Sequence, residues 1–420
     1  MRILLLSQWF DPEPGIKGLN FAKALAALGH DIEVLTGFPN YPGGRVYDGY
    51  RIRPLQRECM DGIPVVRVPL YPSHDTSSLR RILNYTSFAL SSAALGTLCV
   101  KRPDVVYVYH PPPTVGLAAL AMRSLFGCPF VCDIQDLWPD SVASSGMLNS
   151  TWAHGALGSW CRVLYRAASH IVVLSPGFKE TLHRRGVPIE KIDVIYDWCD
   201  EQTLSTGQPT EAGRCLLGPR DRFNVVFAGT MGKVQALDSV LEAARIAATR
   251  VPSAQFVFVG GGIEVPRLTR KTADMGLTNV RFVPKQPMNE IGGILQLADV
   301  LLVHLADHQL FRITIPSKIQ AYMAAGRPIL GGVRGDAATL VERAGCGVTC
   351  EPENPVSLAA AVERLARMDP AALRTLGENG KKFYHENLSL QKGVREFDRI
   401  FQSVSRAGRA KPEPALTGSS

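Results

Sequence analysis

The chain has 420 residues, of which 46% are hydrophobic and 20% charged, so an ordered globular protein with more than one core is expected. The net charge of +8 and the isoelectric point near 9.0 favour an anionic partner, such as a phosphate ester or an acidic membrane surface. No long Lys/Arg run and no aromatic–basic signature of RNA-binding domains occurs, which makes nucleic acid the least favoured partner.

The nine cysteines are scattered without CxxC pairs, and several lie in apolar surroundings. This usage predicts the reduced thiols of a cytosolic protein and not a disulfide framework or a zinc site. The apolar run at residues 3–6 is too short for a signal peptide and is followed by Asp11 and Glu13. A first buried strand is the prediction for this run.

Short apolar runs then alternate with amphipathic helices. A glycine-containing loop at residues 11–18 precedes a helix with Phe21, Leu25 and Leu28 on one face. Further strands are predicted at residues 32–35, 65–68, 105–109, 130–134 and 171–174. This alternation predicts a parallel sheet with helices on both faces.

Residues 82–100 carry no charge and are flanked by Arg80-Arg81 and Lys101-Arg102. The length approaches the ~20 residues that cross a bilayer, yet Asn, Ser and Thr dilute the apolar character. A buried helix of the α/β layer is favoured over a helix inserted into a membrane surface, and a true membrane span is the least favoured of the three.

The pattern restarts after a polar stretch at residues 200–221. Strands are predicted at residues 224–229, 256–260, 280–283, 300–303 and 328–331. Three amphipathic helices are also predicted, with apolar faces formed by Leu237, Val240, Leu241 and Ala244, by Leu358, Ala361, Val362 and Leu365, and by Leu390, Val394, Phe397 and Phe401. The chain therefore reads as two doubly wound halves, joined by a linker near residues 195–222, whose ligand sites face one cleft.

The segment at residues 315–330 combines a helix start, a glycine turn and an apolar strand. Pro316 and Ser317 are expected to open the helix, with the serine capping free amides, and Gly326 is expected to end it. The helix start and the ammonium of Lys318 would together suit a diphosphate. A plain helix–strand connection is the alternative.

Three motifs carry a more specific resemblance: Gly37-Phe38-Pro39-Asn40-Tyr41-Pro42, Asp136-Leu137-Trp138-Pro139-Asp140-Ser141 and Pro316-Ser317-Lys318. Together with Gln8-Trp9-Phe10-Asp11-Pro12-Glu13-Pro14-Gly15, they make the chain resemble glycosyltransferase family 4 over nearly all of residues 1–400. That resemblance implies the α/β GT-B fold, in which two Rossmann-like domains face a central cleft. Within the family, the motifs resemble the bacterial subgroup that adds amino sugars to lipid-linked precursors of surface polysaccharides such as O-antigen or exopolysaccharide.

The resemblance implies an acceptor-binding domain at residues 1–198 and a nucleotide-sugar-binding domain at 199–385. A helix at residues 386–404 would pack back toward the first domain, and 405–420 would be a disordered tail. The implied activity is retaining hexosyl transfer, without a metal or other cofactor, from a UDP-sugar to a polyprenyl-diphosphate-linked saccharide. The protein would lie in the cytoplasm, at the inner face of the cell membrane.

For the donor phosphates, many relatives use an Arg and a Lys five residues apart, where this chain has Thr230 and Gln235. Lys318, Lys233 and Arg312 are the candidate replacements, and a solvated surface side chain is the alternative for each. The remaining donor candidates are positions at which backbone would approach the nucleotide, with Lys17 also able to reach phosphate: Gly15, Lys17, Gly18, Gly229, Thr230, Gly260, Val283, Pro316 and Ser317.

The resemblance places the family's two glutamates, which are separated by seven residues, at Ile313 and Ala321, which carry no carboxylate. Backbone amides at residues 311–316 are the candidate replacement for contacts with the donor sugar. The position of a catalytic-site histidine in many relatives is Gln135, which cannot act as a base. Asp136 is the candidate carboxylate for activating the acceptor, with a helix N-cap as its alternative role. His110 is a further catalytic candidate, with a structural loop role favoured.

A metal site at residues 304–308 (His-Leu-Ala-Asp-His) is disfavoured, because no third ligand pairing is evident and no DxD-like pair occurs. Two rival functions remain open. A sugar-nucleotide 2-epimerase of the same fold would need carboxylates at the donor sugar, and the aligned positions lack them. A non-catalytic nucleotide-sugar-binding partner is favoured by the missing glutamates.

Overall fold

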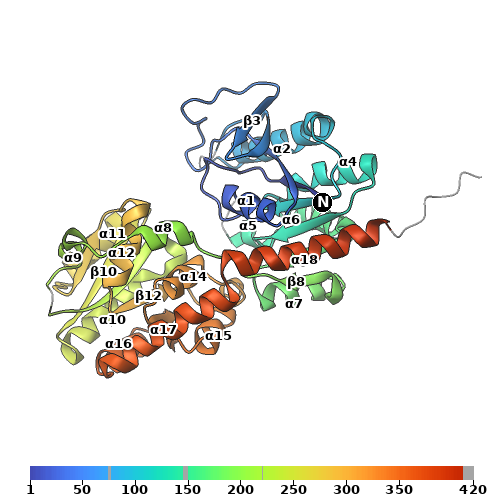
Figure 1. The fold of residues 1–420 in the computed structure, drawn as a ribbon. Coiled ribbons are helices and arrows are strands. Elements are labelled where there is room, and N and C mark those ends of the chain that lie inside the picture. Colours follow the sequence, from blue (N-terminus) through green and yellow to red (C-terminus); the bar gives the residue numbers. More distant parts are fainter. Residues whose placement is uncertain (74–76, 145–149, 220, 410–420) are drawn as a thin grey trace, which may run out of the picture. The chain divides into compact units, whose positions relative to one another are not determined.

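The computed structural model describes residues 1–73, 77–144, 150–219 and 221–409 (Figure 1). The chain divides into two compact units, the first formed by Met1–Ile195 with Gly393–Ser420 and the second by Tyr196–Lys392. Each unit is built around one mainly parallel sheet. The two α/β halves that the sequence pattern predicts are therefore present.

The first unit has an eight-stranded sheet in the order β3-β4-β2-β1-β5-β6-β7-β8, in which only β3 is antiparallel to its neighbour. Its strands are β1 (Arg2–Leu6), β2 (Asp31–Gly37), β3 (Gln56–Met60), β4 (Ile63–Val68), β5 (Val105–His110), β6 (Phe130–Ile134), β7 (His170–Val173) and β8 (Ile192–Val194). Strands β3 and β8 were not predicted. The first is a polar edge strand and the second has only three residues, so neither shows an apolar run.

Helices follow most of these strands: α1 (Leu19–Ala27), α2 (Ser78–Ser91), α3 (Thr97–Cys99), α4 (Gly116–Phe126), α5 (Asp140–Ser144), α6 (Thr151–Ala167) and α7 (Pro176–Arg184). Phe21 and Leu25 of α1 are buried as predicted. Leu28 is instead the C-cap of α1 and is 46% exposed, because the helix ends before the residue can join the buried face.

The uncharged segment at residues 82–100 forms α2, a π-helical turn (Ser92–Gly96) and α3. One side of it packs into the unit through Tyr85 and Phe88, whereas Leu90 and Leu98 are more than 60% exposed. Among the described residues, no helix is both long enough and apolar enough to cross a bilayer. The segment is thus half-buried, with an apolar side left open.

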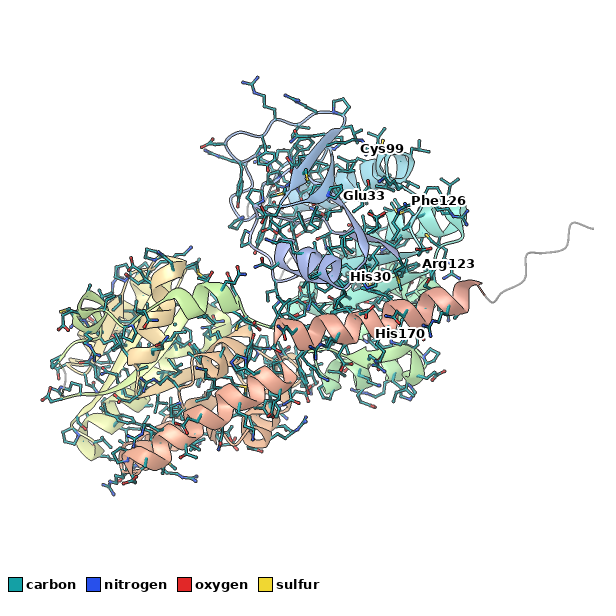
Figure 2. The ribbon with its side chains drawn as sticks, viewed as in Figure 1. His30, Glu33, Cys99, Arg123, Phe126 and His170 are labelled. Atoms are coloured by element: carbon teal, nitrogen blue, oxygen red, sulfur yellow. The ribbon has the colours of Figure 1, made fainter. Side chains whose placement is uncertain are left out.

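The last helix, α18 (Leu390–Arg409), contributes its residues from Gly393 onward to the first unit. Phe397 packs on Phe21, with ring centroids 5.2 Å apart, and on Tyr107 at 5.6 Å. His30, just before β2, lies 2.9 Å from the carboxylate of Asp398, and it is labelled near α18 in Figure 2.

The predicted start of the disordered tail, at residue 405, is too early in the chain. Residues 405–409 continue α18, because the amphipathic pattern runs on and both Val404 and Ser405 are buried. Residues 410–420 lie outside the described part of the chain.

The second unit has a six-stranded parallel sheet in the order β11-β10-β9-β12-β13-β14. Its strands are β9 (Phe223–Thr230), β10 (Ala254–Gly261), β11 (Val280–Val283), β12 (Val300–His304), β13 (Ile329–Gly332) and β14 (Gly347–Cys350). Only β14 was not predicted, because its four residues contain Gly and Thr and are half-exposed. This order is that of a Rossmann-like sheet, with the order reversing between β9 and β12.

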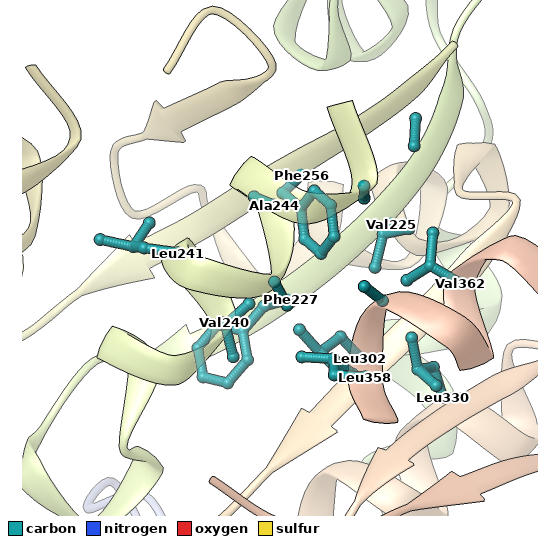
Figure 3. Close-up of a cluster of buried hydrophobic side chains, with 14 of the residues drawn as sticks. Val225, Phe227, Val240, Leu241, Ala244, Phe256, Leu302, Leu330, Leu358 and Val362 are labelled. Atoms are coloured by element: carbon teal, nitrogen blue, oxygen red, sulfur yellow. The ribbon is translucent and has the colours of Figure 1, made fainter. Parts of the chain in front are cut away.

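The helices of the second unit are α8 (Glu201–Thr206), α9 (Glu211–Leu217), α10 (Leu237–Arg250), α11 (Val265–Asp274), α12 (Met288–Leu297), α13 (Gln309–Arg312), α14 (Ser317–Ala324), α15 (Asp336–Arg343), α16 (Pro355–Ala366) and α17 (Pro370–Asn387). The predicted apolar faces of α10 and α16 are buried together. Figure 3 shows Val240, Leu358 and Val362 among the side chains that converge on Phe227 and Leu302 of the sheet. This core holds the strand ends that form the site described next.

Candidate functional site

The carboxyl ends of β9 and β12 form the reversal point of the second sheet, where ligands bind in open α/β folds. Strand β9 pairs with β10 along all eight of its residues, but its pairing with β12 is confined to Val225 and Val226. Beyond Val226 the backbone of β9 therefore needs other partners on this side.

Helix α14 supplies those partners through a buried tyrosine. The hydroxyl of Tyr322 accepts a hydrogen bond from the amide of Ala228 at 2.9 Å and donates one to the carbonyl of Ala228 at 3.2 Å. Tyr322 was not predicted as a site residue, although it lies four positions after Lys318 and hence on the same helix face. It holds the helix start next to the end of β9.

Lys318 projects from that helix start onto the end of β9. Its Nζ lies 3.4 Å from the ring centroid of Phe227 and would be 3.2 Å from a Cβ at position 229, so Gly229 leaves the space that the ammonium uses. Nζ is buried and has no hydrogen-bond partner among the described residues. Burial lowers the pKa of Lys318 to about 7. An unpaired buried cation of this kind is costly, and an anionic ligand would relieve the cost.

The start of α14 adds to the positive potential around Lys318. Pro316 is the N-cap, and no side chain caps the helix, so the predicted capping by Ser317 is wrong. Serine cannot act as the cap here because it is already the first helical residue. Gly326 does end the helix region in the left-handed conformation, at φ 69°. Uncapped amides and a nearby ammonium form a site for an anion.

The predicted glycines line the same edge of the sheet. Gly229 and Gly260 have φ values of 125° and 142°, and a Cβ at Gly260 would collide with the carbonyl of Gly229. Both positions therefore require glycine. Thr230 follows Gly229 and is exposed, whereas Val283 ends β11 and is buried.

Lys233 and Arg312 are the weaker cation candidates. Lys233 is exposed in a short 3-10 turn that Gln235 stabilises by accepting a hydrogen bond from the amide of Gly232 at 2.9 Å. Arg312 forms an ion pair with Asp307 at 3.0 Å, and Asp307 also pairs with Arg334. The charge of Arg312 is thus partly neutralised within the protein, while that of Lys318 is not.

The histidines at residues 304–308 do not form a metal site. Nδ1 of His304 lies 2.8 Å from the carbonyl of Gln235, and its Nε2 accepts from the amide of Glu353, so both nitrogens are in use. Nδ1 of His308 accepts from the amide of Leu310. No group of three or more metal-ligating side chains is found in the described part of the chain.

Four aromatic rings form a row in the first unit. Ring centroids are 5.0 Å apart between Tyr41 and Trp9, 6.4 Å between Trp9 and Tyr85, and 6.2 Å between Tyr85 and Trp138. Three of these rings come from loops after β1, β2 and β6, and Tyr85 comes from α2. They were not predicted as site residues. The sequence did offer one indication of their importance, because Trp9, Tyr41 and Trp138 lie in the motifs that carry the family resemblance.

Asp136 lies at the Trp138 end of this row. It is exposed, and its carboxylate has no hydrogen-bond partner among the described residues. Surrounding protein nevertheless raises the pKa of Asp136 above its usual value by desolvation. The alternative role as a helix N-cap is not observed, because α5 begins only at Asp140. Asp136 therefore remains available to accept a proton.

Gln135 is oriented by a buried carboxylate that was not predicted. Its Nε2 donates to Asp133 at 2.9 Å, and the other oxygen of Asp133 accepts from the hydroxyl of Tyr107 at 2.6 Å. One N–H of the amide is thus committed, which leaves the second N–H and the amide oxygen of Gln135 for hydrogen bonds with a ligand hydroxyl.

His110 cannot contact a substrate, because its side chain is fully buried against Tyr165, with ring centroids 6.0 Å apart. Burial lowers its pKa to about 4, so the imidazole is neutral at physiological pH. Its backbone carbonyl accepts from the amide of Gln135 at 2.7 Å. The prediction of a catalytic His110 is therefore replaced by a structural role.

The loop at residues 11–18 also differs from expectation. The carboxylate of Asp11 accepts from the amide of Leu19 at 2.6 Å, and a Cβ at Gly18 would collide with that carboxylate. Gly18 thus makes room for an internal cap at the start of α1, not for phosphate. Lys17 is buried, with Nζ 5.2 Å from the ring centroid of Phe397. Only Gly15 has open space around its Cα.

Comparison with known proteins gives two family matches. Residues 19–198 match the glycosyl transferase 4-like domain, and residues 222–368 match the glycosyl transferases group 1. The chain is 26% identical over 383 residues to the putative colanic acid biosynthesis glycosyl transferase WcaI of Escherichia coli, covering 87% of this chain and 92% of that one. It is 24% identical over 299 residues to the probable glycosyltransferase WbjE of Pseudomonas aeruginosa, covering 70% and 74%.

Solved structures share the fold. Sucrose-phosphate synthase from Thermosynechococcus elongatus superimposes with a TM-score of 0.68 at 19% identity, covering 97% of this chain and 99% of that chain. HepE from Anabaena, in complex with UDP-glucose, gives a TM-score of 0.67 at 17% identity, covering 96% and 100%. The trehalose-6-phosphate synthase of Burkholderia multivorans reaches 0.73 at 12% identity, covering 99% of both chains. The two sheets therefore form a GT-B fold.

Proposed function

Since the chain belongs to glycosyltransferase family 4, whose members transfer a sugar from a nucleotide-sugar, we propose that it is a retaining hexosyltransferase. The donor is a UDP-sugar carrying an N-acetylated amino sugar, and the acceptor is a lipid-linked saccharide of bacterial surface polysaccharide synthesis. The first unit binds the acceptor, and the second binds the donor.

The observation that carries this proposal is the unpaired, buried ammonium of Lys318. It lies beside Gly229 and the uncapped start of α14, at the reversal point of a Rossmann-like sheet. Charge builds up on the leaving diphosphate as the bond to the sugar breaks, so a cation held in place there favours the transition state. Lys318 would neutralise the diphosphate in place of the Arg and Lys that many relatives have at the positions of Thr230 and Gln235.

On the acceptor side, Asp136 and Gln135 supply the polar groups. The acceptor hydroxyl attacks the anomeric carbon on the face from which the nucleoside diphosphate departs. A bond from that carbon to the acceptor oxygen forms as its bond to phosphate oxygen breaks, and the proton passes to Asp136 or to the leaving phosphate. No metal is required, because the positive charge comes from Lys318 and the helix start.

The identity of the substrates is supported more indirectly. UDP-glucose is bound in the solved structure of HepE, and the name of WcaI refers to a polysaccharide, colanic acid. The amino sugar rests on the resemblance of the three motifs. A place at the cytoplasmic membrane surface is supported by the exposed leucines of α2 and α3 and by the basic residues that flank them, which suit an anionic lipid surface.

The proposed donor is tested by a thermal-shift panel of UDP-, GDP- and dTDP-sugars. Only the UDP-sugars are expected to raise the melting temperature, because a ligand stabilises the folded state that binds it. Labelled UDP-N-acetylglucosamine is then incubated without acceptor, and the products are analysed. Formation of an epimer would show that the protein is a 2-epimerase and overturn the proposed transferase activity. A preference for GDP- or dTDP-sugars would overturn the assignment of UDP as the donor nucleotide.

Donor affinity is expected to depend on pH through Lys318. Its pKa of about 7 means that the free site is largely neutral at pH 8.5, while bound diphosphate favours the ammonium. Binding of a UDP-sugar should therefore take up close to one proton at pH 8.5 and far less at pH 6, and the dissociation constant should increase as pH rises through 7. Isothermal titration calorimetry in two buffers of different ionisation enthalpy measures the uptake. Equal heats in both buffers at pH 8.5 would contradict the prediction.

A further inference from the structure

A cleft of about 480 Å³ lies in the first unit between α2, α4 and α6. This volume is within the range of small-molecule sites. Its walls are mainly apolar and include Ile82, Leu90, Leu117, Trp138, Leu157 and Trp160. Trp138 and Tyr85, which both line it, also form one end of the aromatic row, so the cleft adjoins the end of the row at which Asp136 lies.

Three of the polar side-chain groups in the walls are already used within the protein. The hydroxyl of Thr86 donates to the carbonyl of Ile82 at 2.8 Å, and that of Thr114 donates to the carbonyl of Tyr85 at 3.3 Å. The indole nitrogen of Trp160 donates to the carbonyl of Pro113 at 2.9 Å. A ligand in this cleft would therefore find carbon surfaces and few groups seeking hydrogen bonds, which suits a hydrocarbon.

Arg81 directly precedes Ile82, one of the residues that line the cleft. It precedes Tyr85 by four positions on α2, so the two side chains share a helix face. Its Nε is buried without a hydrogen-bond partner among the described residues. Arg81 and Asp136 both lie close enough to Tyr85 to affect its pKa, although burial is the main cause of that shift. A guanidinium near the lining of an apolar cleft fits an anion attached to a hydrocarbon chain.

We propose that this cleft holds the isoprenoid chain of the lipid-linked acceptor, with Arg81 binding its diphosphate. This rests on the proposed function, and it specifies which part of the first unit recognises the lipid. The acceptor saccharide then begins at the Trp138 end of the aromatic row, beside Asp136. The rings offer flat apolar faces to the sugar, as aromatic side chains do for ligands that have both apolar and polar faces.

Farnesyl diphosphate is the probe, because it carries a short isoprenoid chain and a diphosphate without the unknown saccharide. Binding is followed by quenching of tryptophan fluorescence, since Trp138 and Trp160 line the cleft. Every titration contains saturating UDP, so that the donor site does not bind the probe. Inorganic diphosphate and farnesol are titrated separately to report the two halves of the ligand.

Ala156 is an exposed residue of α6 that lines the cleft, so Ala156→Phe fills the cleft without changing the core. This variant is expected to weaken binding of farnesyl diphosphate and of farnesol at least tenfold. Ser159→Phe places the same ring on the same helix at an exposed position outside the cleft lining, and it should bind as the wild type does.

Arg81→Gln is expected to weaken the binding of farnesyl diphosphate about tenfold and to leave the affinity for farnesol unchanged. The neighbouring exposed Arg80→Gln removes the same charge and should change neither affinity. Equal binding by wild type and Ala156→Phe, while UDP still binds, would overturn the cleft assignment and leave the proposed function standing. If the wild type does not bind UDP, the proposed function itself is contradicted. A third result would be that the wild type binds anionic phospholipid vesicles, loses that binding in Ala156→Phe, and does not bind farnesyl diphosphate at all. This result would make the cleft a bilayer contact and overturn the proposal.

Discussion

Lys318→Met is expected to lower kcat/KM for the UDP-sugar by about 100- to 1000-fold, the usual effect of removing one group that stabilises transition-state charge. The ammonium of Lys318 is buried and has no partner in the described part of the chain, so the variant loses the cation without breaking an internal ion pair. Methionine keeps a similar side-chain length over Phe227. The free energy of unfolding should therefore stay the same or increase, because a costly buried charge is removed.

Steady-state kinetics and thermal unfolding of the same preparation measure both effects. Lys233→Met is the matched control, since it makes the same chemical change at an exposed lysine in the loop after β9. We expect less than a threefold change in kcat/KM for Lys233→Met. If Lys233→Met loses activity and Lys318→Met retains it, the diphosphate is bound by Lys233 and the site assignment is wrong.

Asp136→Asn is expected to lower kcat about 100-fold or more, within the range for loss of a general base, while the dissociation constant of the UDP-sugar stays unchanged. Asparagine keeps the shape of the side chain but cannot accept the proton of the acceptor hydroxyl. The carboxylate of Asp136 makes no hydrogen bond with a described residue, so stability should change little.

The control for this variant is Asp140→Asn, four residues further along the chain. Asp140 forms a partly exposed ion pair with Arg185, and its loss should cost little stability and less than threefold in kcat. Full activity of Asp136→Asn would mean that the leaving phosphate takes the proton alone. Absence of turnover in the wild type with every lipid-linked acceptor, despite tight UDP-sugar binding, would support the non-catalytic partner instead.

Much of the fold could be predicted because it depends on local chemistry. The period of apolar residues located eleven of the fourteen strands, and the three missed strands, β3, β8 and β14, are short or polar. Gly326 was predicted to end its helix as a left-handed residue, because glycine adopts that conformation without strain, and its φ is 69°. The end of α18 was misplaced, since burial of Val404 and Ser405 depends on packing that the tail composition does not show.

The candidate site was predictable in part. Lys318 and Gly229 were named from their motifs, and the structure brings them together at the end of β9. Tyr322 and Asp133 were not named, because their roles are hydrogen bonds to Ala228 and Gln135 that no spacing rule shows. The aromatic row was missed for the same reason, since its four rings come from four separate segments.

By itself, the sequence determined two doubly wound halves and the family resemblance, and it singled out the segment around Lys318 as a candidate phosphate site, because periodicity, glycine and proline act within a few residues. Only the tertiary structure decided which charged or polar candidates remain available. It placed Lys17 against Phe397, paired Arg312 with Asp307, buried His110 against Tyr165 and left Lys318 and Asp136 without internal partners among the described residues. Availability depends on neighbours that are distant in the chain, and those neighbours are set by packing.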